Sequence, residues 1–162
     1  MNGKKIRVWG NAISAVLLLY VTCKFCMTKK ELEREKAGVK KIGGLLATAN
    51  RIIRANSRGK TISNKIEELG IRTMAIYGMG EIGERVMEDI LLNSSVKLLY
   101  GIDIKAAELY MAVSVYTLQQ AAGMEKPDLI LLTVGGGSDS LKKEIREKMS
   151  CEVMTIGELL CE

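Results

Sequence analysis

The chain has 162 residues, of which 48% are hydrophobic and 27% are charged, a composition typical of globular proteins and unlike that of wholly disordered ones. It holds one proline, four cysteines and no histidine. This excludes collagen-like and disulfide-scaffold classes, and it removes the commonest general base together with Ser-His and Cys-His nucleophile pairs. Aromatic residues make up 4%, too few for a stacking platform that binds single-stranded nucleic acid.

Charge divides the chain into a basic first part and an acidic second part. Residues 1–70 hold 15 Lys and Arg against 5 Asp and Glu, whereas residues 71–162 hold 9 against 14. The basic part fits a solvated helix face as well as a surface that meets anionic lipid or an acidic partner. The negative net charge of residues 71–162 argues against nucleic acid as their ligand.

Residues 8–27 are a candidate membrane anchor. Fifteen of these 20 residues are apolar and Lys24 is the only charged one, and a spanning helix needs about 20 such residues. A helix buried against the domain or lying at an interface is the other main interpretation. A cleaved signal is disfavoured because no small-x-small site follows. If the segment spans, its more basic C-terminal flank keeps residues 28–162 in the cytoplasm, anchored to the inner membrane.

Cys23 and Cys26 have C-x-x-C spacing, which occurs in redox pairs and in half-sites for zinc. Neither strand-helix context nor histidine accompanies them. Two small apolar residues in a hydrophobic helix explain the pair better, and we predict no metal site.

Residues 29–70 are predicted to form a basic helical linker between the hydrophobic helix of residues 1–28 and the domain of residues 71–162. Residues 29–37 are strong helix formers, and Gly38 and the pair Gly43-Gly44 interrupt the pattern. Residues 39–53 then place aliphatic side chains at helical spacing, which predicts an amphipathic helix packed on the following domain and ended by Gly59. A short helix over residues 62–69 follows, with Gly70 just after it.

A glycine motif between a strand and a helix carries the main functional signal. The apolar run of residues 73–77 predicts a buried strand, and residues 78–83 read G-x-G-x-x-G before a predicted helix over residues 81–92. Gly78 permits the turn, Gly80 lets backbone approach a pyrophosphate, and Gly83 lets the helix pack close to the sheet. Main-chain amides at the helix start then face the anion. The candidate phosphate-binding residues are therefore Gly78, Met79, Gly80, Glu81, Ile82 and Gly83.

A second predicted strand, residues 96–102, ends at Asp103, 20 residues after Gly83. An acidic residue in this place binds ribose hydroxyls in dinucleotide-binding folds and repels a 2′-phosphate. NAD, or a nucleotide with a free ribose diol, is therefore favoured over NADP. The alternative is a nucleotide-free structural turn with a solvated Asp103.

The remaining sequence continues the alternation of strands and helices. Strands are predicted at residues 112–115, 128–134 and 152–154, and helical segments at residues 118–122, 140–149 and 156–160. The pattern predicts an α/β domain with a five-stranded parallel sheet of order 3-2-1-4-5, with ligands outside the carboxyl ends of the strands. Val134 and Gly135, at the end of the fourth strand, should therefore face the same crevice as residues 78–83.

Residues 40–162 resemble a family of small Rossmann-like domains of bacterial surface-polysaccharide biosynthesis, labelled nucleoside-diphosphate-sugar epimerase-like. Five segments carry the resemblance: residues 58–60, 76–83, 100–103, 127–134 and 155–160. The resemblance implies a site for a nucleotide or nucleotide-sugar, and a glycosyltransferase or polysaccharide-assembly machine as partner. Residues 1–27 lie outside it, and the three glycines at positions 135–137 depart from it.

Catalysis is not predicted from these residues. Sugar epimerases of the short-chain type carry a Tyr-x-x-x-Lys pair, and no tyrosine of this chain is followed four residues later by lysine. No catalytic residue is therefore assigned. Three functions remain open: a nucleotide-binding module, an NAD-linked oxidoreductase or epimerase completed by a partner chain, and an interaction protein with an empty crevice.

Overall fold

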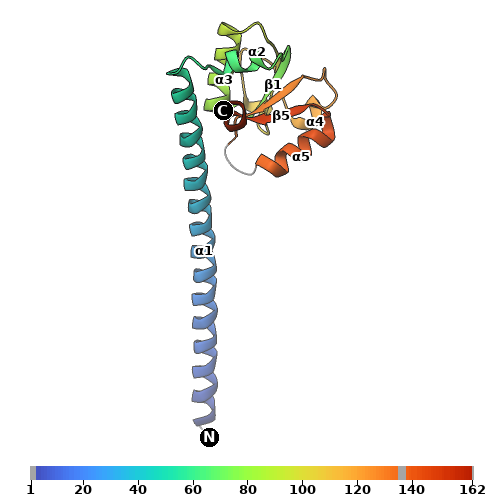
Figure 1. Ribbon diagram of the computed structural model, residues 1–162. Coiled ribbons are helices and arrows are strands. Elements are labelled where there is room, and N and C mark those ends of the chain that lie inside the picture. The colour runs from blue at the N-terminus through green and yellow to red at the C-terminus, as the bar shows by residue number, and fades with distance from the viewer. Residues whose placement is uncertain (1–2, 135–137, 162) are drawn as a thin grey trace. The chain divides into compact units, whose positions relative to one another are not determined.

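The computed structural model describes residues 3–134 and 138–161, with the side chains of residues 3–16 and Ser138 left out of the description. The chain forms two compact units, Met1–Lys40 and Lys41–Glu162. Helix α1 (Gly3–Asn56) provides all the regular structure of the first unit and the beginning of the second (Figure 1).

Helix α1 runs without a break through Gly38 and the pair Gly43-Gly44, so the predicted interruption is wrong. A glycine inside a helix costs about 1 kcal/mol relative to alanine, which weakens a helix but does not end it. The chain leaves the helix at the predicted place, where Gly59 adopts a φ of 73° that favours glycine.

The second unit is a Rossmann-like α/β domain whose five strands are all parallel and lie in the order β3-β2-β1-β4-β5. The predicted fold class and strand order are thus confirmed. The strands are β1 (Thr73–Tyr77), β2 (Lys97–Ile102), β3 (Val115–Tyr116), β4 (Leu129–Leu132) and β5 (Glu152–Thr155). The helices are α2 (Ile62–Glu68), α3 (Glu81–Asn93), the 3₁₀ turn η1 (Ala106–Glu108), α4 (Leu118–Ala121), α5 (Ser138–Met149) and α6 (Ile156–Leu159).

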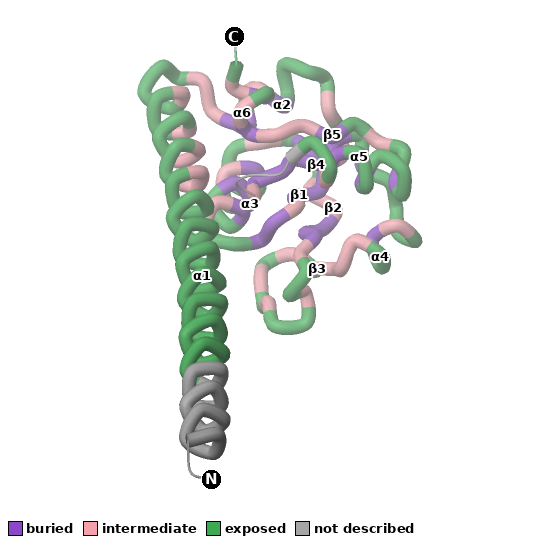
Figure 2. Tube along the Cα trace, turned by 90° about the horizontal axis from the view of Figure 1, so that it is seen from below, coloured by how far each residue is buried: buried purple, intermediate pink, exposed green. Residues whose placement is uncertain are grey.

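Two apolar cores cover the two faces of the sheet, and Figure 2 shows buried residues concentrated on the central strands. Met74 and Ile76 of β1 pack with α2, α3 and α6, whereas Ala75 between them packs with α4 and α5. All four residues of β4 are buried. This continuous burial is the pattern expected for a strand covered by helices on both faces.

Strand β3 is shorter and later than the predicted residues 112–115. Its ladder with β2 consists of Gly101 beside Val115 and Ile102 beside Tyr116. As the edge strand, β3 has a hydrogen-bonding partner on one side only. Its length is therefore set by the positions at which β2 has backbone N–H and C=O groups available for pairing. Val113, which the apolar pattern placed in the strand, packs instead against the core on the α3 side.

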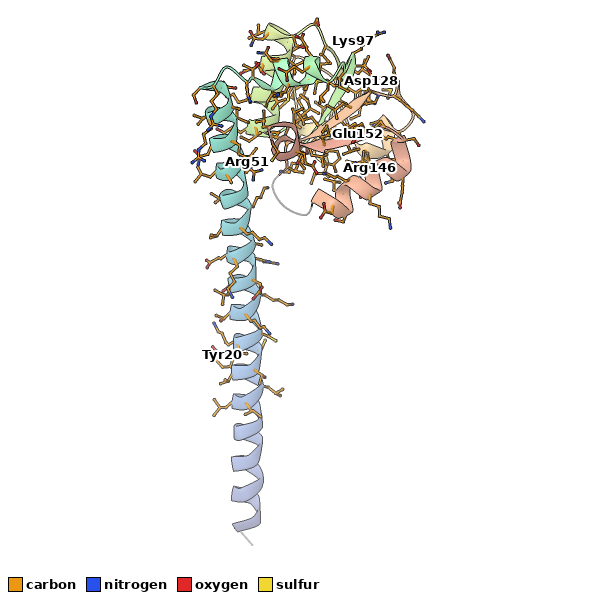
Figure 3. The ribbon with its side chains drawn as sticks, in the orientation of Figure 1. Tyr20, Arg51, Lys97, Asp128, Arg146 and Glu152 are labelled. Atoms are coloured by element: carbon orange, nitrogen blue, oxygen red, sulfur yellow. The ribbon has the colours of Figure 1, made fainter. Side chains whose placement is uncertain are left out.

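Polar contacts fix the strand ends. Asp128, just before β4, accepts hydrogen bonds from the Arg72 and Thr73 amides at 3.1 and 2.9 Å and thereby ties β4 to the start of β1. These backbone donors hold the pKa of Asp128 below its ordinary value. Arg146 of α5 and Glu152 of β5 form an ion pair at 3.4 Å (Figure 3).

The predicted anchor, residues 8–27, lies entirely within α1. Within the described ranges, no helix is apolar over a long enough stretch to cross a bilayer. Leu17, Leu18 and Leu19 are exposed, as are the unbridged Cys23 and Cys26.

Glu158 generates a testable pH dependence of stability. The buried ammonium of Lys142, followed by the Thr155 amide at 2.7 Å, lowers the pKa of Glu158 from 4.5 to about 2. A carboxylate with a depressed folded pKa stabilises the fold above its unfolded pKa, and the contribution disappears as the pH falls toward the folded value. We expect the Tm of the wild type to exceed that of Glu158→Gln at pH 7, with the gap shrinking between pH 4.5 and 2.

Circular dichroism melts at pH 7, 5, 4 and 3 measure this gap. Glu147→Gln is the matched control, because it removes the same charge from an exposed pair with Lys143. A gap between wild type and Glu158→Gln that stays constant from pH 7 to 3 would contradict the role of Glu158.

Candidate functional site

The candidate site begins where the chain turns sharply after β1. Gly78 has a φ of 97°, a conformation that side chains other than glycine rarely adopt. A Cβ there would lie 2.5 Å from Cγ1 of Val134 and 2.9 Å from Oγ1 of Thr133. The Gly78 amide donates to the Ile102 carbonyl at 2.8 Å, which anchors the turn to the end of β2. Both geometry and space therefore require glycine at this position.

Gly83 brings the first turn of α3 against this loop. A Cβ on Gly83 would lie 2.1 Å from the Gly78 carbonyl oxygen and 3.3 Å from Oγ1 of Thr133. The hydroxyl of Thr133, just after β4, is buried and donates to the carbonyls of Tyr77, at 3.1 Å, and Gly78. The roles predicted for Gly78 and Gly83, a turn and a close helix approach, match these contacts.

Asp103 lies at the end of β2, beside the glycine loop. Its Oδ2 accepts a hydrogen bond from the Met79 amide at 2.8 Å, and its Oδ1 accepts one from the Lys105 amide at 2.9 Å. Two backbone donors thus fix the orientation of the carboxylate while Asp103 stays half-buried. Each carboxylate oxygen can accept more than one hydrogen bond, so both retain capacity for a further donor.

Met79 does not offer its amide to a ligand, because Asp103 already accepts from it. Its side chain is buried over Gly101, where a Cβ would lie 2.7 Å from both Cγ and Sδ of Met79. Met79 therefore joins the loop to β2, and the amides left to face a ligand begin at Gly80.

Gly80 differs from its two neighbouring glycines. Its φ of −80° is accessible to every residue, and a Cβ on it would meet no atom within 4 Å. It is the N-cap of α3 and provides no side-chain cap. Among the described residues, the amides of Gly80, Glu81, Ile82 and Gly83 have no hydrogen-bond partner. The start of α3 therefore presents several unpaired N–H groups to open space, an arrangement suited to an anion.

A groove of about 1270 Å³ opens at this point, entirely within residues 41–162. The glycine loop, Asp103 and Val134 form its polar end, and the part of α1 that includes Ile52 and Ile53 forms an aliphatic wall. The volume exceeds the roughly 300–1,000 Å³ of typical small-molecule pockets. The groove therefore has space for a whole nucleotide together with a further group.

Charges at the groove are mixed. Glu81 and Asp103 line it beside the basic Lys41, Arg85 and Lys105. Arg85 pairs with Glu88 at 3.1 Å, and Lys105 pairs with Glu108 at 3.9 Å. Lys41 has no ion-pair partner among the described residues, so attraction for phosphate in this groove would come from the α3 amides together with this lysine.

Tyr77 is a candidate acid–base residue that the motif analysis left unassigned, since it lines the groove and is half-buried. Its burial, followed by the nearby Glu144 and Asp103 carboxylates, raises the pKa of the phenol. A tyrosine base needs the opposite shift, because it must lose its proton near neutral pH. The environment of Tyr77 keeps the phenol protonated.

The structure brings together most of the residues predicted from sequence. All six loop residues, Asp103 and Val134 line the one groove, whereas Gly135 lies outside the described residues. Sequence analysis missed Thr133, whose hydroxyl locks the loop, and the groove wall from α1. The threonine just before Val134 was the available signal for the first. The aliphatic spacing of residues 39–53 predicted that this helix packs on the domain, but it did not indicate that the helix lines the groove.

No protein-family model, no curated protein and no solved structure matches the chain. Within the described ranges, no group of three or more Cys, Asp or Glu side chains is placed to hold a metal ion.

Gly83 and Gly80 should respond differently to the same added methyl group. Gly83→Ala places a Cβ against the Gly78 carbonyl and should lower the free energy of unfolding by about 2–3 kcal/mol, despite the better helix propensity of alanine. Gly80→Ala meets open space in an accessible conformation and should change it by less than about 1 kcal/mol. Urea unfolding followed by circular dichroism measures both, and equal losses for the two variants would refute the assigned geometry.

Proposed function

We propose that residues 41–162 form a binding module for a nucleotide, a nucleotide-sugar or NAD, whose phosphates lie at the start of α3. The observation that carries this proposal is the environment of Gly80. Its backbone needs no positive φ, and a side chain there would meet no protein atom. Unpaired amides surround the same open space. A ligand that approaches the backbone explains why a glycine occupies this position.

Asp103 supports the same proposal from the other side of the groove. Its carboxylate is held by the Met79 amide, one residue before Gly80, so the acid and the anion cradle are fixed relative to one another. A ribose diol would donate to the remaining acceptor capacity of this carboxylate, whereas a 2′-phosphate would be repelled. We therefore infer a preference for NAD or a nucleotide with a free diol over NADP.

Binding without turnover fits the residues of this groove best. Tyr77 is held protonated, and the chain contains neither histidine nor a Tyr-x-x-x-Lys pair. The alternative, an NAD-linked oxidoreductase or epimerase, requires a partner chain to supply the base. We propose that the module serves bacterial surface-polysaccharide assembly beside a glycosyltransferase or a similar partner; the resemblance of residues 40–162 is the support for this role.

Ligand binding should raise the melting temperature of the full chain. At a ligand concentration 100 times Kd, binding stabilises the folded state by about 2.7 kcal/mol, which corresponds to roughly 5–10 °C for a chain of this size. We expect such a shift with NAD, a UDP-sugar or a CDP-linked ligand in a thermal-shift panel, and a smaller one with NADP.

Gly80→Val fills the proposed pyrophosphate position and should abolish the shift while leaving the fold intact, since no protein atom lies within 4 Å of where its Cβ would be. Gly80→Ala provides the graded control. If no nucleotide shifts the melting temperature at millimolar concentration, or if Gly80→Val retains the full shift, the proposed function is wrong.

We also propose that residues 8–27 associate with a membrane surface. The support is the run Leu17, Leu18, Leu19, Tyr20 and Val21, whose side chains are all exposed (Figure 3 labels Tyr20). Such a run loses water-exposed apolar area when it enters the interfacial zone. The full chain should float with phosphatidylcholine vesicles in a density gradient, and Leu18→Lys/Leu19→Lys should stay at the bottom. Wild-type protein that fails to float would contradict the proposal.

A further inference from the structure

Five basic side chains surround a hollow of about 210 Å³ that is separate from the nucleotide groove. The hollow lies between the end of α1, Lys60 in the connection that follows, Lys65 of α2 and the residue after α6. Its lining contains no carboxylate; Ala55 and Leu160 are the other two lining residues. We call it the basic hollow. Its cationic residues are Arg51, Arg54, Arg58, Lys60 and Lys65.

The three arginines have no carboxylate partner among the residues that the structure describes. Lys65 of the hollow is paired with Glu68 at 2.6 Å, as are cations elsewhere in the unit with their own partners, for example Lys148 with Glu144 at 2.8 Å. Like charges gathered around one hollow repel each other. An anion from outside the chain would relieve that repulsion.

Helical spacing places Arg51 and Arg54 on one side of α1, because they are three residues apart in the helix. Arg58 lies in the turn after the helix and lines the same hollow. The opposite side of the same turns carries Ile52 and Ile53, which line the nucleotide groove. The two cavities therefore share α1 as a wall but no lining residue.

The Arg51 guanidinium lies close to Gly157 of α6. A Cβ on Gly157 would lie 2.2 Å from Nη1 of Arg51 (Figure 3 labels Arg51 on α1). The φ of Gly157 lies outside the left-handed region, so the backbone there does not require glycine. The Arg51 guanidinium therefore lies against α6, beside the hollow that it lines.

The size of the basic hollow restricts the ligand. At about 210 Å³ it falls below the roughly 300–1,000 Å³ typical of sites for drug-sized molecules. Planar guanidinium groups match phosphate oxygens with paired hydrogen bonds. We propose that the basic hollow binds a small, multiply charged phosphate anion, either free diphosphate or the phosphate group of a lipid headgroup.

Isothermal titration of the full chain with pyrophosphate in low-salt buffer tests the proposal. We expect saturable one-to-one binding at this site that weakens about tenfold or more in Arg54→Gln/Arg58→Gln, because charge-assisted hydrogen bonds are removed. Lys143→Gln/Lys148→Gln, which removes two exposed charges of α5, is the charge-matched control and should keep the affinity.

Vesicles distinguish the two phosphate sources. Co-sedimentation with phosphatidylcholine vesicles, with and without phosphatidylglycerol, should depend on Arg54 and Arg58 if the phosphate belongs to a lipid. The proposal stands if either pyrophosphate affinity or the phosphatidylglycerol-dependent fraction falls in the arginine variant and not in the lysine control. It is overturned if neither falls or if both pairs lose equally.

Gly80→Val separates this site from the nucleotide groove. Pyrophosphate binding that is lost in Gly80→Val but retained in Arg54→Gln/Arg58→Gln would place the anion at α3. That result would overturn the basic hollow as a phosphate site and support the proposed function instead.

Discussion

The close approach of Gly83 to the Gly78 carbonyl is the constraint on which the candidate site depends. Because neither position has room for a Cβ, the first turn of α3 can lie directly against the end of β1. The Thr133 hydroxyl then closes the loop from the end of β4. Asp103 closes it from the end of β2 by accepting the Met79 amide. Three strand ends are thus brought together by one turn, and the open position at Gly80 is a consequence of that arrangement.

Local sequence patterns predicted the central strand β1, which pairs with a strand on each side. The strand of residues 73–77 was predicted with the bounds that β1 has, because a short apolar run ending in glycine leaves little freedom for a central strand. The strand order also followed, since the glycine motif fixes which strand is central in a doubly wound sheet. The carboxyl ends of these strands, and with them Asp103 and the glycine loop, could then be placed at one edge.

The features that sequence analysis missed depend on partners distant in the chain. Strand β3 begins only where β2 has free groups, so an apolar pattern at residues 112–115 could not give its register. Sequence analysis predicted a break at Gly38, but helix α1 continues through this residue, and an added Cβ there would meet no atom within 4 Å. Thr133 is a buried hydroxyl in a run of aliphatic residues, and its role is visible only once the Gly78 carbonyl lies beside it.

Two cavities along α1 would recognise phosphate by different physical means. At the start of α3 the donors are neutral amides, and the charges that line the groove are of both signs. Binding there depends on the geometry of the glycine loop and is weakly screened by salt, because the hydrogen bonds are short-range. At the basic hollow the donors are cationic side chains, including three arginines without a carboxylate partner among the described residues, so attraction acts over a Debye length of about 10 Å at 0.1 M salt and weakens as salt increases. One helix can serve both because its period separates aliphatic and basic residues onto different sides. Ile52 and Ile53 line the groove, while Arg51 and Arg54, their neighbours in sequence, line the hollow. The basic charge of the first 70 residues is therefore not spread evenly over helical surface: part of it is gathered where α1 meets α2 and α6.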